Sequence, residues 1–186
     1  PPIEGAGLDM VFSVRGIVDV ARMRRALAEV RRIAIVGGGF IGMEVAPIVR
    51  AMGKSVVVVE AEDRLLKRVT SKPVSRWLED LHSGHGVEVI SGGKVEAILG
   101  HRRLRSVELA DGSSLEVDAV LLSVGAVANA EIAAEAGIAT DDGIVVDVHG
   151  HTSAPGVLAC GDCARFPSAR FGRSVRIESV QNATDH

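Results

Sequence analysis

The stretch IAIVGGGFIGMEVA, residues 33–46, decides the fold of this chain. Its branched apolar residues are typical of a buried strand, its glycines break the strand, and a helical pattern follows. The spacing of Gly37, Gly39 and Gly42 fits G-x-G-x-x-G, the strand–turn–helix pattern that holds a pyrophosphate. In that pattern Gly37 allows a tight turn, Gly39 leaves room for the phosphates, and Gly42 lets helix and strand pack closely.

The sequence around this stretch alternates between strand and helix patterns. The uninterrupted valines at 56–59 indicate a strand covered on both faces, as in a parallel sheet. Gly53 is expected to end the preceding helix in a left-handed conformation, although Pro47 lies inside that helix. The order predicts a doubly wound parallel sheet. The predicted elements are a helix at 17–29, a strand at 33–36, a helix at 40–52, a strand at 55–59, a helix at 73–82 and a strand at 87–90.

An antiparallel insert interrupts this alternation after residue 90. Short alternating segments predict its strands, and Asp111-Gly112 predicts a hairpin turn between the last two. Beyond the insert the apolar pattern returns, and the buried-looking run at 157–160 leads into a Gly-Asp pair. The predicted elements are strands at 94–99, 104–109, 115–117 and 119–124, a helix at 131–136, and strands at 144–148 and 157–160.

Glu60 completes the dinucleotide pattern, because it ends the second strand 18 residues beyond Gly42. A carboxylate there can accept hydrogen bonds from ribose hydroxyls, and it would repel the 2′-phosphate of NADP by roughly 4 kcal/mol at 4 Å. Although Arg64, Lys67 and Arg68 follow, they come after the acid and do not replace it, so NAD is the predicted ligand. The alternative is a Gly-rich turn that holds no ligand.

Composition limits the other classes of function. The chain has 186 residues, 47% of them apolar, which is enough for a core and excludes a disordered chain. A net charge of −3 offers no basic surface for nucleic acid, and no apolar run is long enough to span a membrane. Two cysteines and no visible signal peptide favour the cytoplasm. Because the chain opens on Pro1 without Met, we expect a piece of a longer protein.

Four further acidic or thiol groups leave alternatives open. Glu44 lies in the first turns of the second helix, where it could accept a hydrogen bond from the nicotinamide amide or simply favour the helix dipole. Cys160 and Cys163 form a C-x-x-C pair that could be redox-active or bind metal, but no second pair completes a zinc site. Asp162 between them could instead bind sugar-like hydroxyls.

These segments together resemble the ferredoxin reductase group of the flavoprotein pyridine nucleotide-disulphide oxidoreductases. The resemblance runs in order through IVGGGFIGMEVA (35–46), VVVVEAEDRLLKRV (56–69), LADGSSLEVDAVLLSVGAVAN (109–129), DDGIVVD (141–147), HTSAPGVLACGDCARFP (151–167) and RIESVQNA (176–183). It implies a Rossmann-like NAD-binding domain at 17–122 with the antiparallel insert. It also implies a lead-in at 1–16 from an FAD-type domain and a returning, incomplete segment of that domain at 123–186.

The resemblance also implies roles for individual residues. It assigns NAD to the glycine loop, the second helix and the strand end that follows, and it assigns FAD to positions near the end of the chain. The implied NAD-binding residues are Gly37, Gly38, Gly39, Phe40, Ile41, Gly42, Glu44, Glu60, Ala61, Arg68 and Gly125. The implied FAD-side residues are Asp162 and Val180.

The activity implied is hydride transfer from NADH to FAD, followed by electron transfer to a ferredoxin-type iron–sulphur partner. No residue is expected to be an acid–base catalyst, because the cofactors carry this chemistry. There are two alternatives. The protein could pass electrons to a different acceptor, such as a disulphide, oxygen or nitrite system, or it could be a dinucleotide-binding module without turnover. The chain departs from the family in lacking an FAD phosphate loop, so we expect it to be inactive alone. It also carries Pro47 inside a helix, and Cys160 at a position where we expect a packing residue.

Overall fold

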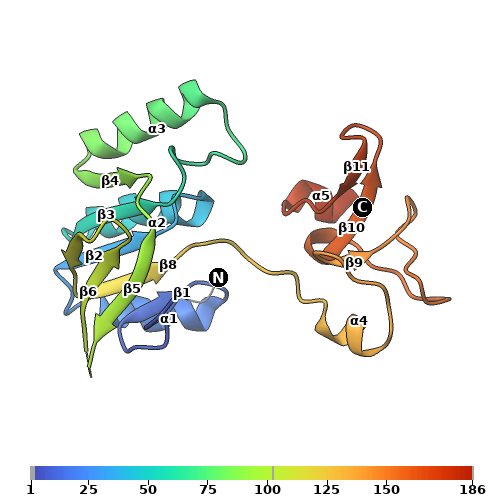
Figure 1. The fold of residues 1–186 in the computed structure, drawn as a ribbon, viewed down its shortest axis with the longest axis horizontal. Coiled ribbons are helices and arrows are strands. Elements are labelled where there is room, and N and C mark those ends of the chain that lie inside the picture. The colour runs from blue at the N-terminus through green and yellow to red at the C-terminus, as the bar shows by residue number, and fades with distance from the viewer. Residues whose placement is uncertain (1–2, 102, 186) are drawn as a thin grey trace. The chain divides into compact units, whose positions relative to one another are not determined.

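The computed structural model describes residues 3–101 and 103–185, which form two compact units. The first unit ends at Gly125 and the second begins at Ala126. A parallel sheet in the order β1-β8-β2-β3-β4 is the centre of the first unit (Figure 1). Its strands are β1 (Val11–Ser13), β2 (Arg32–Val36), β3 (Ser55–Glu60), β4 (Val87–Ser91) and β8 (Ala119–Leu122).

Helices pack on one face of this sheet and the insert packs on the other. Side chains of the helices, such as Leu27 and Val49, share a core with Ile33 and Val58. The opposite face carries Val57 and its neighbours against the insert. The helices are α1 (Ile17–Ala26), α2 (Phe40–Ala51) and α3 (Lys72–Gly84), and the insert is the antiparallel sheet of β5 (Val95–Gly100), β6 (Leu104–Leu109) and β7 (Ser114–Glu116).

The parallel sheet and the antiparallel insert predicted from the sequence are therefore confirmed. The packing adds that the insert, rather than a further layer of helices, covers the second face. Gly53 follows α2 with φ +78°, the left-handed conformation expected at that position, and Pro47 lies within α2. Gly112, with φ +86°, turns the chain between β6 and β7 as predicted.

The second unit is built of short elements. Strand β10 pairs with β11 on one side and with β9 on the other. Its elements are α4 (Glu131–Glu135), β9 (Ile144–Val145), the 3-10 turn η1 (Gly161–Cys163), β10 (Ala164–Ser168), β11 (Arg173–Val175) and α5 (Val180–Asp185).

The strand predicted at 157–160 is wrong. The segment forms only an isolated β-bridge, between Leu158 and His151. Next to this bridge the Thr152 N–H donates a hydrogen bond to the Val157 carbonyl at 3.1 Å. Val157 and Leu158 are exposed, so the apolar pattern there does not mark a buried strand in this unit. The first unit adds β1, which lies in the segment predicted as an extended lead-in, as an edge strand paired with β8.

Candidate dinucleotide site

The turn between β2 and α2 requires glycine at two positions of the motif. Gly37 has φ +106°, and a Cβ there would lie 2.3 Å from the carbonyl oxygen of Ser123. A Cβ on Gly42 would lie 2.2 Å from the Gly37 carbonyl oxygen and 3.3 Å from Ile35 Cγ2. The tight turn and the close approach of helix to strand therefore follow from the missing side chains.

Gly39 differs, because the chain leaves the space around it free. The nearest atom to a Cβ on Gly39 would be the Ser123 carbonyl oxygen at 4.0 Å. The first bond of α2 runs from the Met43 N–H to the Gly39 carbonyl at 3.0 Å, and within the described residues nothing accepts from the N–H groups of Phe40, Ile41 and Gly42. Free N–H groups at a helix N-terminus beside an open glycine fit a pyrophosphate.

Glu60 is held at the end of β3 by two backbone groups. Its Oε2 accepts a hydrogen bond from the Gly38 N–H at 2.7 Å, and its Oε1 accepts one from the Glu62 N–H at 2.7 Å. The bond to Gly38, which is buried, connects the glycine loop to the end of β3. The sequence places Glu60 near the loop, but only the structure shows that it binds the loop directly.

The structure separates the three cations that follow Glu60. Arg64 donates to the Lys67 carbonyl at 2.8 Å and to the Thr70 carbonyl at 2.9 Å, so its guanidinium holds the backbone. Lys67 pairs with Glu62 at 2.8 Å and Asp63 at 3.2 Å. Hydrogen bonds to these two carboxylates raise the pKa of Lys67, and the Lys67 hydrogen bond lowers the pKa of Asp63. Arg68 is exposed, with no hydrogen bond or ion pair to any described residue.

Other predicted residues of the first unit lie on its surface. Phe40 and Ile41 are exposed at the start of α2, and Glu44 is exposed one turn later without a partner among the described residues. Ala61 is exposed directly after Glu60. Gly125 has φ +101° and open space around it, as a loop that approaches a ligand requires.

Two predicted residues lie in the second unit. The Asp162 side chain is exposed and makes no hydrogen bond with a described residue, while its carbonyl accepts from Arg176 Nη1 at 3.1 Å. Arg176 also pairs with Asp142 at 3.3 Å. Val180 begins α5 and is exposed. The carboxylate of Asp162 is therefore held at a fixed backbone position and left free to accept hydrogen bonds.

The cysteines beside Asp162 are both free thiols. The Cys163 thiol donates to the Cys160 carbonyl at 3.4 Å. Across the described ranges, no three side chains of the metal-binding types come together as a possible metal site. Cys160 is exposed in the second unit, so the expected packing role for it is wrong.

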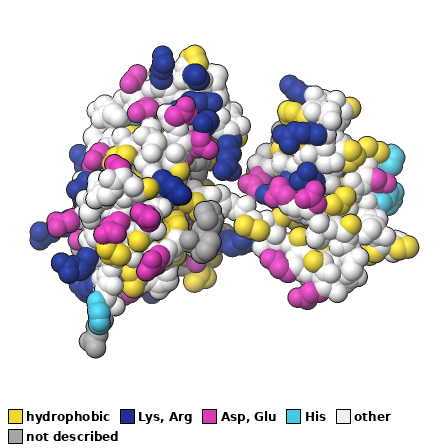
Figure 2. Space-filling view, viewed as in Figure 1, with side chains coloured by type: hydrophobic (Ala, Val, Ile, Leu, Met, Phe, Trp, Pro, Cys, Tyr) yellow, Lys and Arg dark blue, Asp and Glu magenta, His cyan; other side chains and the backbone are white. Residues whose placement is uncertain are grey.

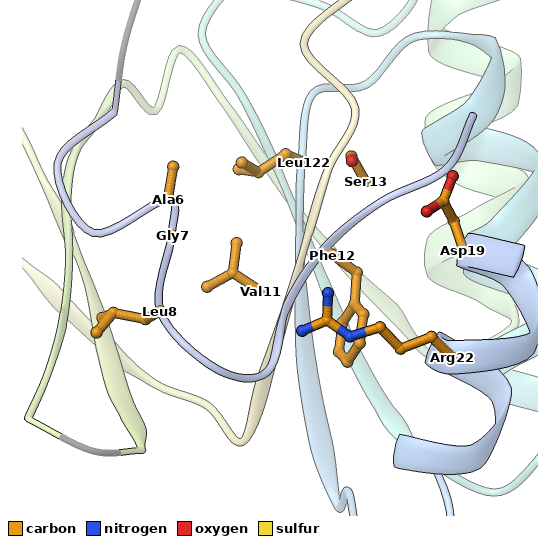
Figure 3. A pocket seen from close by; sticks show the side chains of 9 residues that line it. All are labelled: Ala6, Gly7, Leu8, Val11, Phe12, Ser13, Asp19, Arg22 and Leu122. Carbon is orange, nitrogen blue, oxygen red and sulfur yellow. The ribbon is translucent and has the colours of Figure 1, made fainter. Parts of the chain in front are cut away.

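A separate cavity of about 230 Å³ lies beside β1 and α1 (Figure 3). The guanidinium of Arg22 lies 5.3 Å from the centroid of the Phe12 ring, and Asp19 and Leu122 also contribute to the lining. No predicted site residue lines this cavity. Acidic and basic side chains are interspersed over the visible face (Figure 2), and no described helix is long and apolar enough to cross a membrane.

A protein-family model described as pyridine nucleotide-disulphide oxidoreductase matches residues 1–186. The chain is 43% identical over 179 residues to the 5,5'-dehydrodivanillate O-demethylase ferredoxin reductase subunit of Sphingobium, covering 94% of this chain and 43% of that protein. It is 39% identical over 175 residues to putidaredoxin reductase of Pseudomonas putida, covering 92% of this chain and 42% of that protein.

Solved structures agree with the sequence comparison. The crystal structure of the ferredoxin reductase for the CYP199A2 system from Rhodopseudomonas palustris matches with a TM-score of 0.96 and 40% identity. The match covers all of this chain and 46% of that one. The chain therefore spans less than half the length of these relatives.

Proposed function

The chain belongs to the pyridine nucleotide-disulphide oxidoreductase family, and from this premise we propose that it is the NAD(H)-binding part of a flavoprotein reductase. The whole protein would oxidise NADH and pass electrons to a ferredoxin-type iron–sulphur protein. The names of the relatives, a ferredoxin reductase subunit and putidaredoxin reductase, support electron transfer to a ferredoxin-type protein. The description of the family, pyridine nucleotide-disulphide oxidoreductase, supports a pyridine nucleotide as the electron donor. Because the chain spans only 43% of the first of these relatives, we propose that activity for the longer protein.

The geometry around Gly39 is the observation that carries the proposal. The free N–H groups at the start of α2 and the open side of Gly39 suit the pyrophosphate of a dinucleotide. Glu60, bonded to the Gly38 N–H, suits the adenosine ribose at the neighbouring strand end. We assign Phe40, Ile41, Glu44, Ala61, Arg68 and Gly125 to the surface along which the rest of the cofactor lies.

We propose NADH rather than NADPH as the ligand. A 2′-phosphate would lie against the Glu60 carboxylate, which among the described residues has no cationic partner and accepts from backbone N–H groups alone. Arg64 and Lys67, which could have offset that repulsion, are already bonded within the chain. A single free guanidinium, that of Arg68, is then left among these three cations.

For the second unit we propose a place in the flavin site. The exposed Asp162 carboxylate suits the hydroxyls of a ribityl chain, and Val180 would lie near the ring. The glycine loop and Glu60 would hold NADH, and Asp162 would hold part of the flavin; when both are bound, the cofactors would supply the hydride-transfer chemistry that this chain's residues orient. We assign 17–122 to an NAD domain, 1–16 to a lead-in from an FAD-type domain, and 123–186 to the returning, incomplete segment of that FAD domain, in a cytoplasmic protein.

Binding of the pyridine nucleotide to the chain tests the proposal directly. Calorimetry should show that NADH and ADP-ribose bind, and that NADPH binds at least tenfold more weakly. Glu60→Ala should weaken NADH binding by about 1–3 kcal/mol, the range for hydrogen bonds to a charged group. Glu79→Ala, at a half-buried acid on α3, is the matched control and should leave the affinity unchanged. NADPH binding as tight as NADH binding would contradict the cofactor assignment.

A dinucleotide-binding module without turnover remains the second candidate, together with a reductase for a different acceptor. Flavin content and NADH oxidation by the longer protein separate the module from both reductases. Reduction of a ferredoxin, compared with oxygen or a small disulphide under the same conditions, separates the acceptors. Faster reduction of the disulphide than of the ferredoxin would favour the alternative acceptor.

A further inference from the structure

A buried polar network lies under the connection between β3 and α3, and the proposed function does not use it. Ser75, in the first turn of α3, is fully buried. Its hydroxyl donates to the Leu65 carbonyl at 2.6 Å, accepts from Arg64 Nη1 at 2.7 Å, and lies 3.1 Å from Thr70 Oγ1. A buried hydroxyl with these partners fixes the backbone around it.

The network holds the turn that contains Arg68. Arg64 binds the carbonyls of Lys67 and Thr70, which lie before and after Arg68 in the chain. The N–H groups of Val69 and Thr70 both donate to the Leu66 carbonyl at 3.0 Å, which closes the turn. The backbone on each side of Arg68 is therefore fixed, although the Arg68 side chain is exposed.

The same turn is attached to the glycine loop. The Leu66 N–H donates to the Gly38 carbonyl at 3.0 Å, and Leu65 Cδ2 would lie 2.5 Å from a Cβ on Gly38. Leu66 has φ +51°, a conformation that costs a non-glycine residue energy and that persists where surrounding contacts enforce it. Turn and loop are thus joined at Gly38, the residue that also binds Glu60.

We propose that Ser75 and Arg64 are positioning residues for the dinucleotide, acting through Arg68. They set the turn against Gly38, so that the free Arg68 guanidinium is available to the adenosine end of a ligand whose ribose binds Glu60. A guanidinium suits that place because it can stack on a purine ring and bind phosphate oxygens. The inference rests on the proposed function, which supplies the ligand.

A double-mutant cycle between Ser75 and Arg68 tests this inference, with calorimetric affinity for NADH and for ADP-ribose as the readout. Ser75→Ala and Arg68→Ala should each weaken both ligands by about tenfold, the effect of losing one hydrogen bond to a charged group. In the Arg68→Ala background, Ser75→Ala should cost less than twofold. A merely structural effect of Ser75 would not depend on Arg68.

Two further variants keep the test decisive. Ser83→Ala, at an exposed serine of the same helix, should leave both affinities unchanged. If Ser75→Ala does not fold, Arg64→Lys replaces it in the cycle, because lysine keeps the charge but cannot bind two carbonyls and a hydroxyl in the same fork. Additive losses in a chain that binds NADH would overturn this inference alone. A wild-type chain that binds neither ligand would overturn the proposed function, and this inference with it.

Discussion

A Cβ at Gly39 would meet no atom of the described residues closer than 4.0 Å, whereas one at Gly42 would lie 2.2 Å from the carbonyl oxygen of Gly37. Gly39 therefore borders open space, and Gly42 packs against the backbone of Gly37. Alanine at the two positions should therefore have different effects, although both glycines belong to one motif. The comparison separates glycine needed for a ligand from glycine needed for packing.

We predict that Gly39→Ala folds normally but loses at least tenfold in NADH affinity, because its methyl group occupies the space assigned to the pyrophosphate. The free energy of unfolding of this variant should change by less than about 1 kcal/mol, because residue 39 precedes α2 with φ −81°, which alanine can adopt. Gly42→Ala should lower that free energy by about 1–3 kcal/mol, as overpacking does. Urea unfolding and calorimetry measure both quantities. Unchanged NADH binding in Gly39→Ala would contradict the placement of the pyrophosphate.

His82 provides a pH-dependent contribution to stability. It is buried near the end of α3, and burial, with the nearby charge of His85, lowers its pKa below the usual 6.5. The folded state therefore prefers the neutral ring. The associated stability is complete above about pH 6.5 and is lost as the pH falls below that value, because the unfolded chain takes up the proton first.

Urea unfolding at pH 7.5 and pH 5.5 measures this effect. The wild-type chain should be less stable at the lower pH, and His82→Gln should reduce the difference. His101→Gln, at an exposed histidine, is the matched control and should keep the wild-type difference. An identical pH dependence in all three proteins would show that His82 does not carry it.

At the scale of elements, the end of a helix depends on backbone conformation. Gly53 follows α2 with φ +78°, while Gly84 is the last residue of α3 and has no positive φ. In the part of the chain that the structure describes, a Cβ on either glycine would meet no atom within 4 Å. Gly53→Ala should lower the free energy of unfolding by about 1 kcal/mol, the cost of a left-handed conformation in an L-residue.

Gly84→Ala should instead raise the free energy of unfolding, by up to about 1 kcal/mol, because alanine favours the helix and restricts the unfolded chain. Thermal and urea unfolding of the two variants beside the wild-type chain give the comparison. Equal effects from both substitutions would mean that the sign of φ does not decide the outcome here.

The elements that the sequence predicts well are those that combine a regular pattern of residues with burial in a core. The valines of β3 and the glycine loop after β2 together favour a parallel sheet, because an uninterrupted apolar strand and a strand–turn–helix glycine pattern are both typical of one. The segment at 157–160 has the apolar content of a strand, but Leu158 forms only one bridge and stays exposed. Hydrophobic content alone does not reveal whether a neighbouring layer exists to cover a strand.

At the scale of the whole molecule, the sequence predicts the main site residues but not how they are connected. The G-x-G-x-x-G spacing and Glu60 lead to the proposed dinucleotide site because they follow a local pattern. The bond from the Gly38 N–H to Glu60 joins residues 22 positions apart, and the bonds of Ser75 to Arg64 and Leu65 join residues 11 and 10 positions apart. Such contacts depend on tertiary packing, and no sequence spacing encodes them.

The two units differ in the helices that they offer for binding NAD or FAD. The first unit has a helix of 12 residues, α2, whose N-terminus can hold a pyrophosphate. Among the described residues, the helices of the second unit are α4 and α5, with five and six residues, and η1 with three. The sequence contains one G-x-G-x-x-G motif, at 37–42, which we assign to NAD.

We therefore predict that the purified chain binds NADH but carries no stoichiometric flavin. Asp162 can bind ribityl hydroxyls, but hydrogen bonds from one exposed carboxylate are screened by water and do not supply a flavin phosphate site. Visible absorbance should show no flavin band, and no NADH-dependent reduction of a dye should follow, even when FAD is added. Asp162→Ala should leave NADH affinity within about twofold, because the residues that we assign to NAD all belong to the first unit and Asp162 belongs to the second. Flavin that copurifies at one equivalent per chain would mean that the second unit completes a flavin site without a phosphate loop.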